Sequence, residues 1–297
     1  MIDGLCGLNV FMHRGAAPER LSFMRKFVGA GIVSKLPPIL AGKHFVAPSV
    51  FEPENLLREA RRQKNLPSAE VPEICILDPD GDIVRRLRRD KTARRFTAWP
   101  CYHSELDQFT LAGQSVGIVG CAVGAPFAVL VAEQLRASGC RFLVSLTSAG
   151  QIVPAGRPPY FVIIDRALRD EGTSYHYANP GDYAEADAAL VEMARAALRD
   201  RNIPCLVGAS WTTDAPFRET AEAVACARAS GVLAVEMEAA ALYAFARVAG
   251  MHVLCIAAIT NVMGQIENDF EKGELDGAAD ALALLEAIAS RAAERLF

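Results

Sequence analysis

Residues 115–126 have the sequence SVGIVGCAVGAP, and this stretch decides the fold class. A short apolar run ends at Gly120, a second glycine follows at Gly124, and an Ala-rich segment begins at Ala125. A strand that passes through a glycine turn into a helix is the recurring unit of α/β proteins. We therefore expect a strand over residues 115–119 and a helix over residues 125–137.

The same alternation extends from about residue 72 to the end of the chain. Apolar, β-branched runs predict further strands over 74–77, 142–146, 160–164, 205–209 and 253–259. Ala-rich stretches predict further helices over 184–200, 220–229, 236–249 and 278–295. Strands that are apolar along their whole length need cover on both faces. We therefore predict one main α/β domain over residues 71–297, with a central sheet sandwiched by helices.

Residues 1–70 have a different character. Six glycines and six prolines interrupt any periodicity, and a helix is expected only over residues 54–64, opened by Pro53. We interpret this region as an N-terminal extension.

The composition excludes several classes of protein. Hydrophobic residues make up 52% and charged residues 22%, which excludes a disordered chain. A net charge of −4 argues against nucleic acid or an anionic membrane as a partner. No apolar run reaches the roughly 18–20 residues of a membrane span. The eight cysteines form no CxxC pair, so we expect a reduced, cytoplasmic protein.

Small and polar residues follow several of the predicted strands, where ligands collect in α/β folds. Gly120 lets the backbone approach a ligand closely, or else allows tight strand–helix packing. Ser148, in the sequence TSAG at 147–150, can bind phosphate through its hydroxyl and backbone N–H, or belong to an ordinary turn. Phe217 lies in a mixed polar and aromatic loop over 211–220, and Asn261 ends the last apolar strand.

Two acids open the predicted helix that follows residues 231–235. Glu236 and Glu238 are two positions apart and cannot share a helical face. Carboxylates at a helix N-terminus are favoured by the helix dipole. Because the alanines that follow require close packing, an acid held here is also suited to accept two hydroxyls of a sugar. No metal site is expected, because no histidine or further acid lies at ligand spacing.

Residues 235–242, with the sequence VEMEAAAL, resemble the signature of the nucleoside phosphorylase superfamily, specifically its hexameric purine nucleoside and uridine phosphorylase branch. Segments 120–126, 147–150, 169–174 and 211–220 match in the family's order. The resemblance implies a mixed central sheet and phosphorolysis of a nucleoside to free base and pentose 1-phosphate. It implies no metal or organic cofactor, inorganic phosphate as co-substrate, and a homo-oligomer built from dimers, possibly a hexamer.

The resemblance also assigns roles to residues. Segment 80–85 is similar to the family's GDPxR segment, which nominates Gly81 and Arg85 as phosphate ligands together with Ser148, and we add Gly120 on its strand-end position. Glu238 would accept the ribose 2′ and 3′ hydroxyls and Met237 would pack on the ribose, with Glu236 beside them. Phe217 would lie near the base. As catalytic residues, Arg85 would hold phosphate against the oxocarbenium-like sugar and Asn261 would donate to the departing base.

The chain departs from the family pattern at two informative positions. Ser145 stands where the family usually has a phosphate-binding Arg, and Asn261 stands where the bacterial purine enzymes have an acid. An Asn can still bind a 6-oxopurine, which favours a purine nucleoside. Ser145 leaves a nucleoside hydrolase that uses water as one alternative, and a non-catalytic nucleoside-binding or regulatory protein as another.

Overall fold

The computed structural model describes residues 36–45, 47–263 and 267–296. The chain divides into two compact units, Met1–Lys43 and His44–Phe297, and the second contains the central sheet with its helices. The expected helix at 54–64 is α2 (Pro53–Lys64), which packs on α4 (Ala125–Ala137) within this unit. The division of the chain at residue 70 stays a prediction, and most of the N-terminal extension lies outside the described residues.

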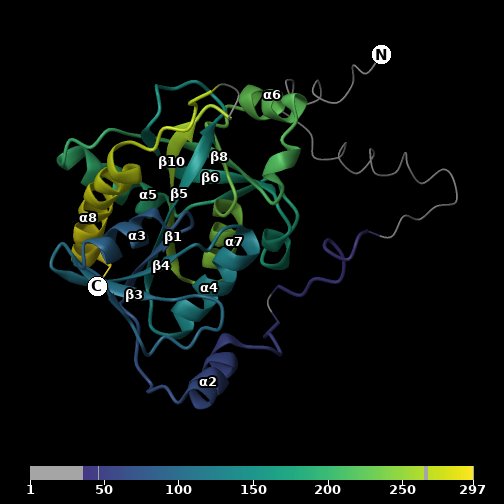
Figure 1. The fold of residues 1–297 in the computed structure, drawn as a ribbon. Coiled ribbons are helices and arrows are strands. Elements are labelled where there is room, and N and C mark those ends of the chain that lie inside the picture. The colour runs from purple at the N-terminus through teal and green to yellow at the C-terminus, as the bar shows by residue number, and fades with distance from the viewer. Residues whose placement is uncertain (1–35, 46, 264–266, 297) are drawn as a thin grey trace, which may run out of the picture. The chain divides into compact units, whose positions relative to one another are not determined.

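A ten-stranded mixed sheet forms the centre of the unit (Figure 1). Its strand order is β10-β6-β8-β9-β5-β1-β4-β3-β2, with β7 paired to β6. The strands are β1 (Ile74–Asp78), β2 (Arg94–Arg95), β3 (Asp107–Leu111), β4 (Gln114–Gly120), β5 (Phe142–Gln151), β6 (Tyr160–Asp170), β7 (Tyr183–Glu185), β8 (Cys205–Thr213), β9 (Ala234–Glu236) and β10 (His252–Asn261).

Pairing between β5 and β10 closes five of these strands into a ring. Around the ring, β5–β10, β6–β8 and β8–β9 are parallel, whereas β10–β6 and β5–β9 are antiparallel. Strands β1, β4, β3 and β2 extend from β5, beginning with its parallel partner β1, and β7 is paired to β6 outside the ring. The predicted mixed sheet is confirmed, and the ring brings the carboxyl end of β5 beside those of β9 and β10.

Helices cover both faces of the sheet, as the apolar strands require. Successive residues of β1 point to opposite faces: Cys75 and Leu77 join one apolar core, and Ile74 and Ile76 join another. The first core is covered by α4 and α7 (Ala239–Ala249), and the second by α3 (Asp82–Arg89), α5 (Ala188–Asp200) and α8 (Ala278–Arg295) (Figure 1). Helix α6 (Ala221–Ala229) packs against a smaller third core around Trp211.

Two predicted helices begin later than expected. The helix predicted over 184–200 begins at Ala188, because residues 183–185 pair with β6 as β7 and the Asp187 carboxylate accepts the N–H of Ala189 as an N-cap. The helix predicted over 236–249 begins at Ala239, because Glu236 ends β9. Strands β2, β3 and β7 were not predicted. None of the helices in the described ranges is long and apolar enough to cross a bilayer.

Candidate functional site

Six of the nine predicted site residues line one cavity of about 420 Å³. They are Ser148, Phe217, Glu236, Met237, Glu238 and Asn261. They come from the end of β5, the turn between β9 and α7, the end of β10 and the short helix η2 (Pro216–Arg218). A cavity of this size suits a small-molecule ligand.

Gly150 is the point where the strands that carry this site meet. It pairs with Val235 on β9 and with Asn261 on β10. A Cβ at this position would lie 2.7 Å from the sulfur of Met263, 3.2 Å from Val235 and 3.3 Å from Asn261. The cavity therefore has a backbone floor that leaves no space for a side chain.

Glu238 presents a free carboxylate oxygen inside this cavity. Its side chain is buried, and its Oε1 accepts the backbone N–H of Gly124 at 2.7 Å. Its Oε2 is also buried and has no hydrogen-bond partner among the described residues. Burial, reinforced by the negative charge of Glu236, raises the pKa of Glu238 to about 8. An unpartnered buried acceptor at a cavity wall is suited to bind the hydroxyl of a ligand.

Glu236 differs, because the protein itself uses both of its oxygens. Oε1 accepts the hydroxyls of Ser210 at 2.9 Å and Thr212 at 2.5 Å, and Oε2 accepts the N–H groups of Glu238 and Ala239, each at 2.7 Å. Burial raises the pKa of Glu236, and these four hydrogen bonds oppose the shift. A carboxylate has about four acceptor positions, so none is left for a ligand. These contacts assign Glu236 to fixing the start of α7, and its predicted role in substrate binding gains no support.

The remaining ligand-side residues lie around the same cavity. The Asn261 side chain donates to Thr260 at 3.1 Å and accepts the N–H of Met263 at 2.9 Å, which leaves one N–H and one oxygen lone pair. Phe217 is fully exposed at the rim. Met237 lines the wall between the two acids.

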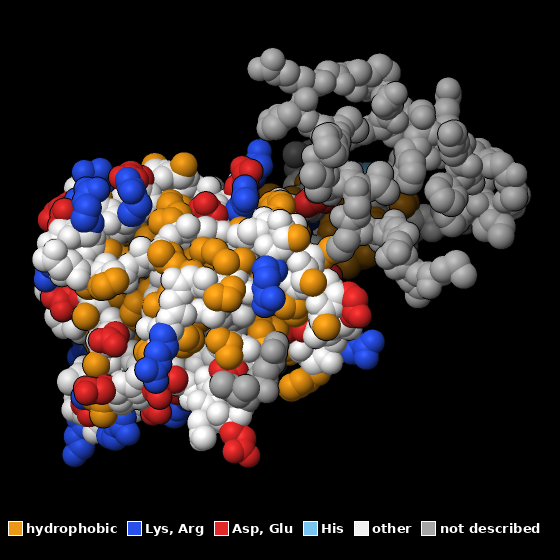
Figure 2. All heavy atoms as spheres, turned by 90° about the horizontal axis from the view of Figure 1, so that it is seen from above, with side chains coloured by type: hydrophobic (Ala, Val, Ile, Leu, Met, Phe, Trp, Pro, Cys, Tyr) orange, Lys and Arg blue, Asp and Glu red, His pale blue; other side chains and the backbone are white. Residues whose placement is uncertain are grey.

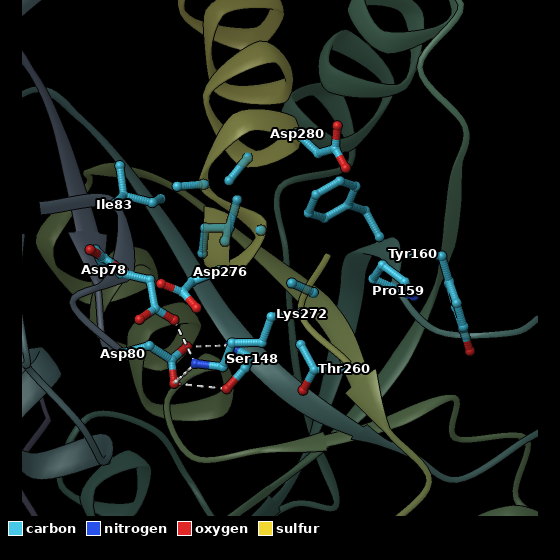
Figure 3. A pocket seen from close by; sticks show the side chains of 17 residues that line it. Asp78, Asp80, Ile83, Ser148, Pro159, Tyr160, Thr260, Lys272, Asp276 and Asp280 are labelled. Carbon is cyan, nitrogen blue, oxygen red and sulfur yellow. Dashed lines mark hydrogen bonds and ion pairs between the residues drawn. The ribbon is translucent and has the colours of Figure 1, made fainter. Parts of the chain in front are cut away.

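In another part of the cavity lining, the two donors of Ser148 already hold an anion. Its backbone N–H donates to Asp80 Oδ2 at 2.7 Å, and its hydroxyl donates to Asp80 Oδ1 at 2.8 Å (Figure 3). The prediction that Ser148 binds phosphate stays a prediction, since its two donors hold the Asp80 carboxylate in the structure. Sequence reasoning missed Asp80. The signal was its place in the acidic run DPDGD directly after β1.

The other three predicted phosphate ligands lie beside Asp80 and outside the cavity lining. Gly81 has φ +75°, and a Cβ there would lie 2.7 Å from the Cys121 sulfur, so only glycine fits. A Cβ at Gly120 would lie 3.0 Å from Val84 and 3.4 Å from Gly81. This contact supports the interpretation that Gly120 allows tight strand–helix packing. The Arg85 guanidinium donates to the Asp80 carbonyl at 2.9 Å and pairs with Asp82.

Ser145, in place of the family's usual Arg, is buried in β5, and its hydroxyl has no partner in the described part of the chain. A second cation nevertheless lies nearby. The Lys272 ammonium pairs with Asp82 and is 4.0 Å from Asp80 Oδ1. Lys272 was not predicted, because nothing in the sequence links it to residues almost two hundred positions earlier.

The basic run over 85–95 is balanced by acids. Arg88 and Arg95 both pair with Glu105 and Asp107, and Arg86 pairs with Asp90. On the face displayed in Figure 2, Lys and Arg side chains are interspersed with Asp and Glu. The described residues hold no group of three or more His, Cys, Asp or Glu side chains placed to bind a metal ion.

Comparison with known proteins places the chain in a family. The family described as Phosphorylase superfamily matches residues 73–294. The chain is 27% identical over 154 residues to a DeoD-type purine nucleoside phosphorylase of Myxococcus xanthus, covering 51% of this chain and 64% of that protein. It is 30% identical over 162 residues to a guanosine phosphorylase of Halorubrum lacusprofundi, covering 54% and 66%. The matched segments thus span slightly less than two thirds of these curated relatives.

Solved structures share the fold. A uridine phosphorylase from Vibrio fischeri superposes with a TM-score of 0.66 at 19% identity, over 79% of this chain and 99% of that one. A purine nucleoside phosphorylase from Toxoplasma gondii superposes with a TM-score of 0.64 at 14% identity, over 76% and 92%. The resemblance inferred from residues 235–242 is confirmed: the chain belongs to the phosphorylase superfamily.

Proposed function

We propose that the protein is a nucleoside phosphorylase, a pentosyltransferase that cleaves a purine nucleoside to free base and pentose 1-phosphate. The observation that carries this proposal is Glu238, with one oxygen held by Gly124 and the other buried and unpartnered in the cavity. A ribose supplies two adjacent hydroxyl donors, which a carboxylate accepts well. Ser148, whose two donors hold a carboxylate, lines another part of the same cavity.

The chemistry follows from these positions. The bond between C1′ and the base nitrogen breaks, and its electron pair leaves with the base. An oxygen of phosphate forms the new bond to C1′. Glu238 would fix the ribose, and the free N–H of Asn261 would donate to the departing base, where negative charge develops. No step requires an organic cofactor, since phosphate is the co-substrate.

The choice of a purine rests on Asn261. It retains one donor and one acceptor toward the cavity, the pair that the edge of a 6-oxopurine requires. The relatives include purine nucleoside, guanosine and uridine phosphorylases, so the base is a proposal made from this residue.

Hydrolysis is the second candidate, and one observation favours it. Asp80 occupies the hydroxyl and N–H of Ser148, and Ser145 supplies no charge to attract phosphate. A nucleoside hydrolase would keep Glu238 and use water in place of phosphate.

We also propose a homo-oligomer. Phe217 lies at the rim of the cavity and is fully exposed in the single chain. A large aromatic side chain in this place would be covered by a neighbouring subunit. Light scattering coupled to size exclusion tests this: we expect a dimer or a multiple of it, and a monomer at micromolar concentration would contradict the proposal.

The deciding experiment measures release of free base by chromatography from a panel of purine and pyrimidine nucleosides, with and without phosphate. Phosphate-dependent release from purine nucleosides, lost in Glu238→Ala and kept in the exposed control Glu70→Ala, supports phosphorolysis. Release independent of phosphate assigns a hydrolase. Thermal stabilisation by a nucleoside without any release assigns a binding protein.

A further inference from the structure

The carboxylate of Asp80 occupies both hydrogen-bond donors of Ser148. Asp80 accepts the backbone N–H through one oxygen and the hydroxyl through the other, at 2.7 and 2.8 Å (Figure 3). A carboxylate that bridges two donors in this way resembles two oxygens of a bound phosphate, because it also offers two oxygens and a negative charge. The two anions cannot share the site, because both need the same two donors.

The charges around Asp80 oppose a second anion. Asp78, Asp80 and Asp82 lie within one short turn, and Asp78 is buried with a pKa raised by burial to about 6. Lys272 and Arg85 are the cations beside them, and both pair with Asp82. A phosphate dianion next to this group meets repulsion unless Asp80 moves away from Ser148.

The structure offers a place for the displaced carboxylate. A smaller cavity of about 60 Å³ adjoins the first, and both are lined by Asp80 and Ser148. Lys272 and Thr260 also line the smaller cavity, with Lys272 Nζ already 4.0 Å from Asp80 Oδ1 (Figure 3). A carboxylate group fits a space that holds at least one or two water molecules, about 30 Å³ each in the liquid.

We infer that Asp80 sets the affinity of this site for phosphate: it is an internal anion that phosphate must displace from Ser148 toward Lys272. This inference rests on the proposed function for its biological meaning, and on the two hydrogen bonds for its physics. Its consequence is a phosphate affinity below what the donors of Ser148 would provide alone.

The test is isothermal titration of the full chain with inorganic phosphate, for wild type, Asp80→Asn and Asp80→Ala. Removing the competing charge should tighten phosphate binding about 10- to 100-fold, the range expected for charge-assisted hydrogen bonds of about 1.5–3 kcal/mol. The matched control is Asp276→Asn, which removes an acid from the wall of the smaller cavity without freeing Ser148. Equal tightening in Asp80→Asn and Asp276→Asn would overturn the inference, because it would assign the effect to net charge.

A double variant tests whether the gain in phosphate affinity depends on Ser148. Ser148→Ala added to Asp80→Asn should abolish the gain, since the hydroxyl that phosphate gains is then missing. Unchanged or weaker phosphate binding in Asp80→Asn, in protein whose circular dichroism and melting temperature match wild type, overturns the inference. Because binding is measured without nucleoside, this outcome is separate from a failure of the proposed function, which the base-release assay reports. If turnover occurs, the KM for phosphate should fall with the Kd while the KM for nucleoside stays unchanged.

Discussion

Two parts of the main cavity are built differently: the part around Glu238, named the ribose end after the proposed function, and the part around Ser148, named the anion end. At the ribose end, one buried oxygen of Glu238 has no partner among the described residues, and Glu236 accepts the backbone N–H groups of Glu238 and Ala239. At the anion end, Ser148 has its donors filled by Asp80, and Arg85 is engaged with the backbone and with Asp82. The carboxylate of Glu238 thus keeps an acceptor that the protein does not use, whereas the donors of Ser148 are satisfied by Asp80. On the proposed function, phosphate binding requires Asp80 to release Ser148.

The largest effect is expected from Glu238→Ala at the ribose end. Losing the hydrogen bonds that two ribose hydroxyls would donate to this carboxylate, about 1.5–3 kcal/mol each, should lower kcat/KM for base release by at least about 100-fold. Steady-state assays with Glu70→Ala as control measure this. Activity close to wild type would show that the free oxygen of Glu238 does not bind the sugar.

Substitutions of Glu236 and Glu238 should have opposite effects on the free energy of unfolding. Glu236→Ala leaves two hydroxyls and two N–H groups unpaired, so we expect the free energy of unfolding to fall by about 3 kcal/mol or more in urea titrations. Glu238→Gln should instead stabilise the fold at pH 9, because it removes a buried charge. A similar loss in both variants would mean that Glu238 is also a structural residue.

Ser148→Ala tests the anion end. It should raise the KM for phosphate about 10- to 100-fold through loss of one hydrogen bond to a charged group, about 1.5–3 kcal/mol, and leave the KM for nucleoside unchanged. The direction is opposite to that expected for Asp80→Asn. A change in nucleoside KM of the same size would show that the two ends are not separate sites.

The smallest effect is expected from pH. Burial raises the pKa of Glu238 to about 8, so the ribose-binding carboxylate forms as pH rises through that value. We expect nucleoside kcat/KM to increase about tenfold between pH 7 and 9, and to be flat over this range in Glu238→Gln. Since the native state binds this proton more tightly than the unfolded state does, stability contributed by Glu238 is present near pH 4.5 and lost toward pH 8. A pH profile that is identical in the variant would contradict this assignment.

The sequence predicted much of the fold, and the position of Glu238 at the start of a helix, because both depend on local patterns. Uniform apolar runs predicted β1, β4 and β5, and the sequence VEMEAAAL places Glu238 at a helix start. Closure of the sheet between β5 and β10 was not predictable, because it joins strands about a hundred residues apart. The short strand β7 was hidden for another reason: it is three residues long, too short for a period to show. The apolar run over 231–235 did indicate a strand, which the structure has as β9.

The anion end was harder to predict because its contacts are long-range. Ser148 and Asp80 are 68 positions apart, and Lys272 and Asp82 are 190 apart. The similarity of segment 80–85 to a phosphate-binding motif nominated Gly81 and Arg85. The contact with Ser148 is made by Asp80, the residue before that glycine. Which acid of a DPDGD run reaches a neighbouring strand is decided by the backbone of the turn.

Gly150 has one more consequence. Three strands meet there, and a single methyl group would touch Met263, Val235 and Asn261 at once. These three side chains line the cavity, so a Cβ at residue 150 would have to displace at least one of them. The shape of the cavity wall at this point therefore depends on one missing carbon atom of the main chain.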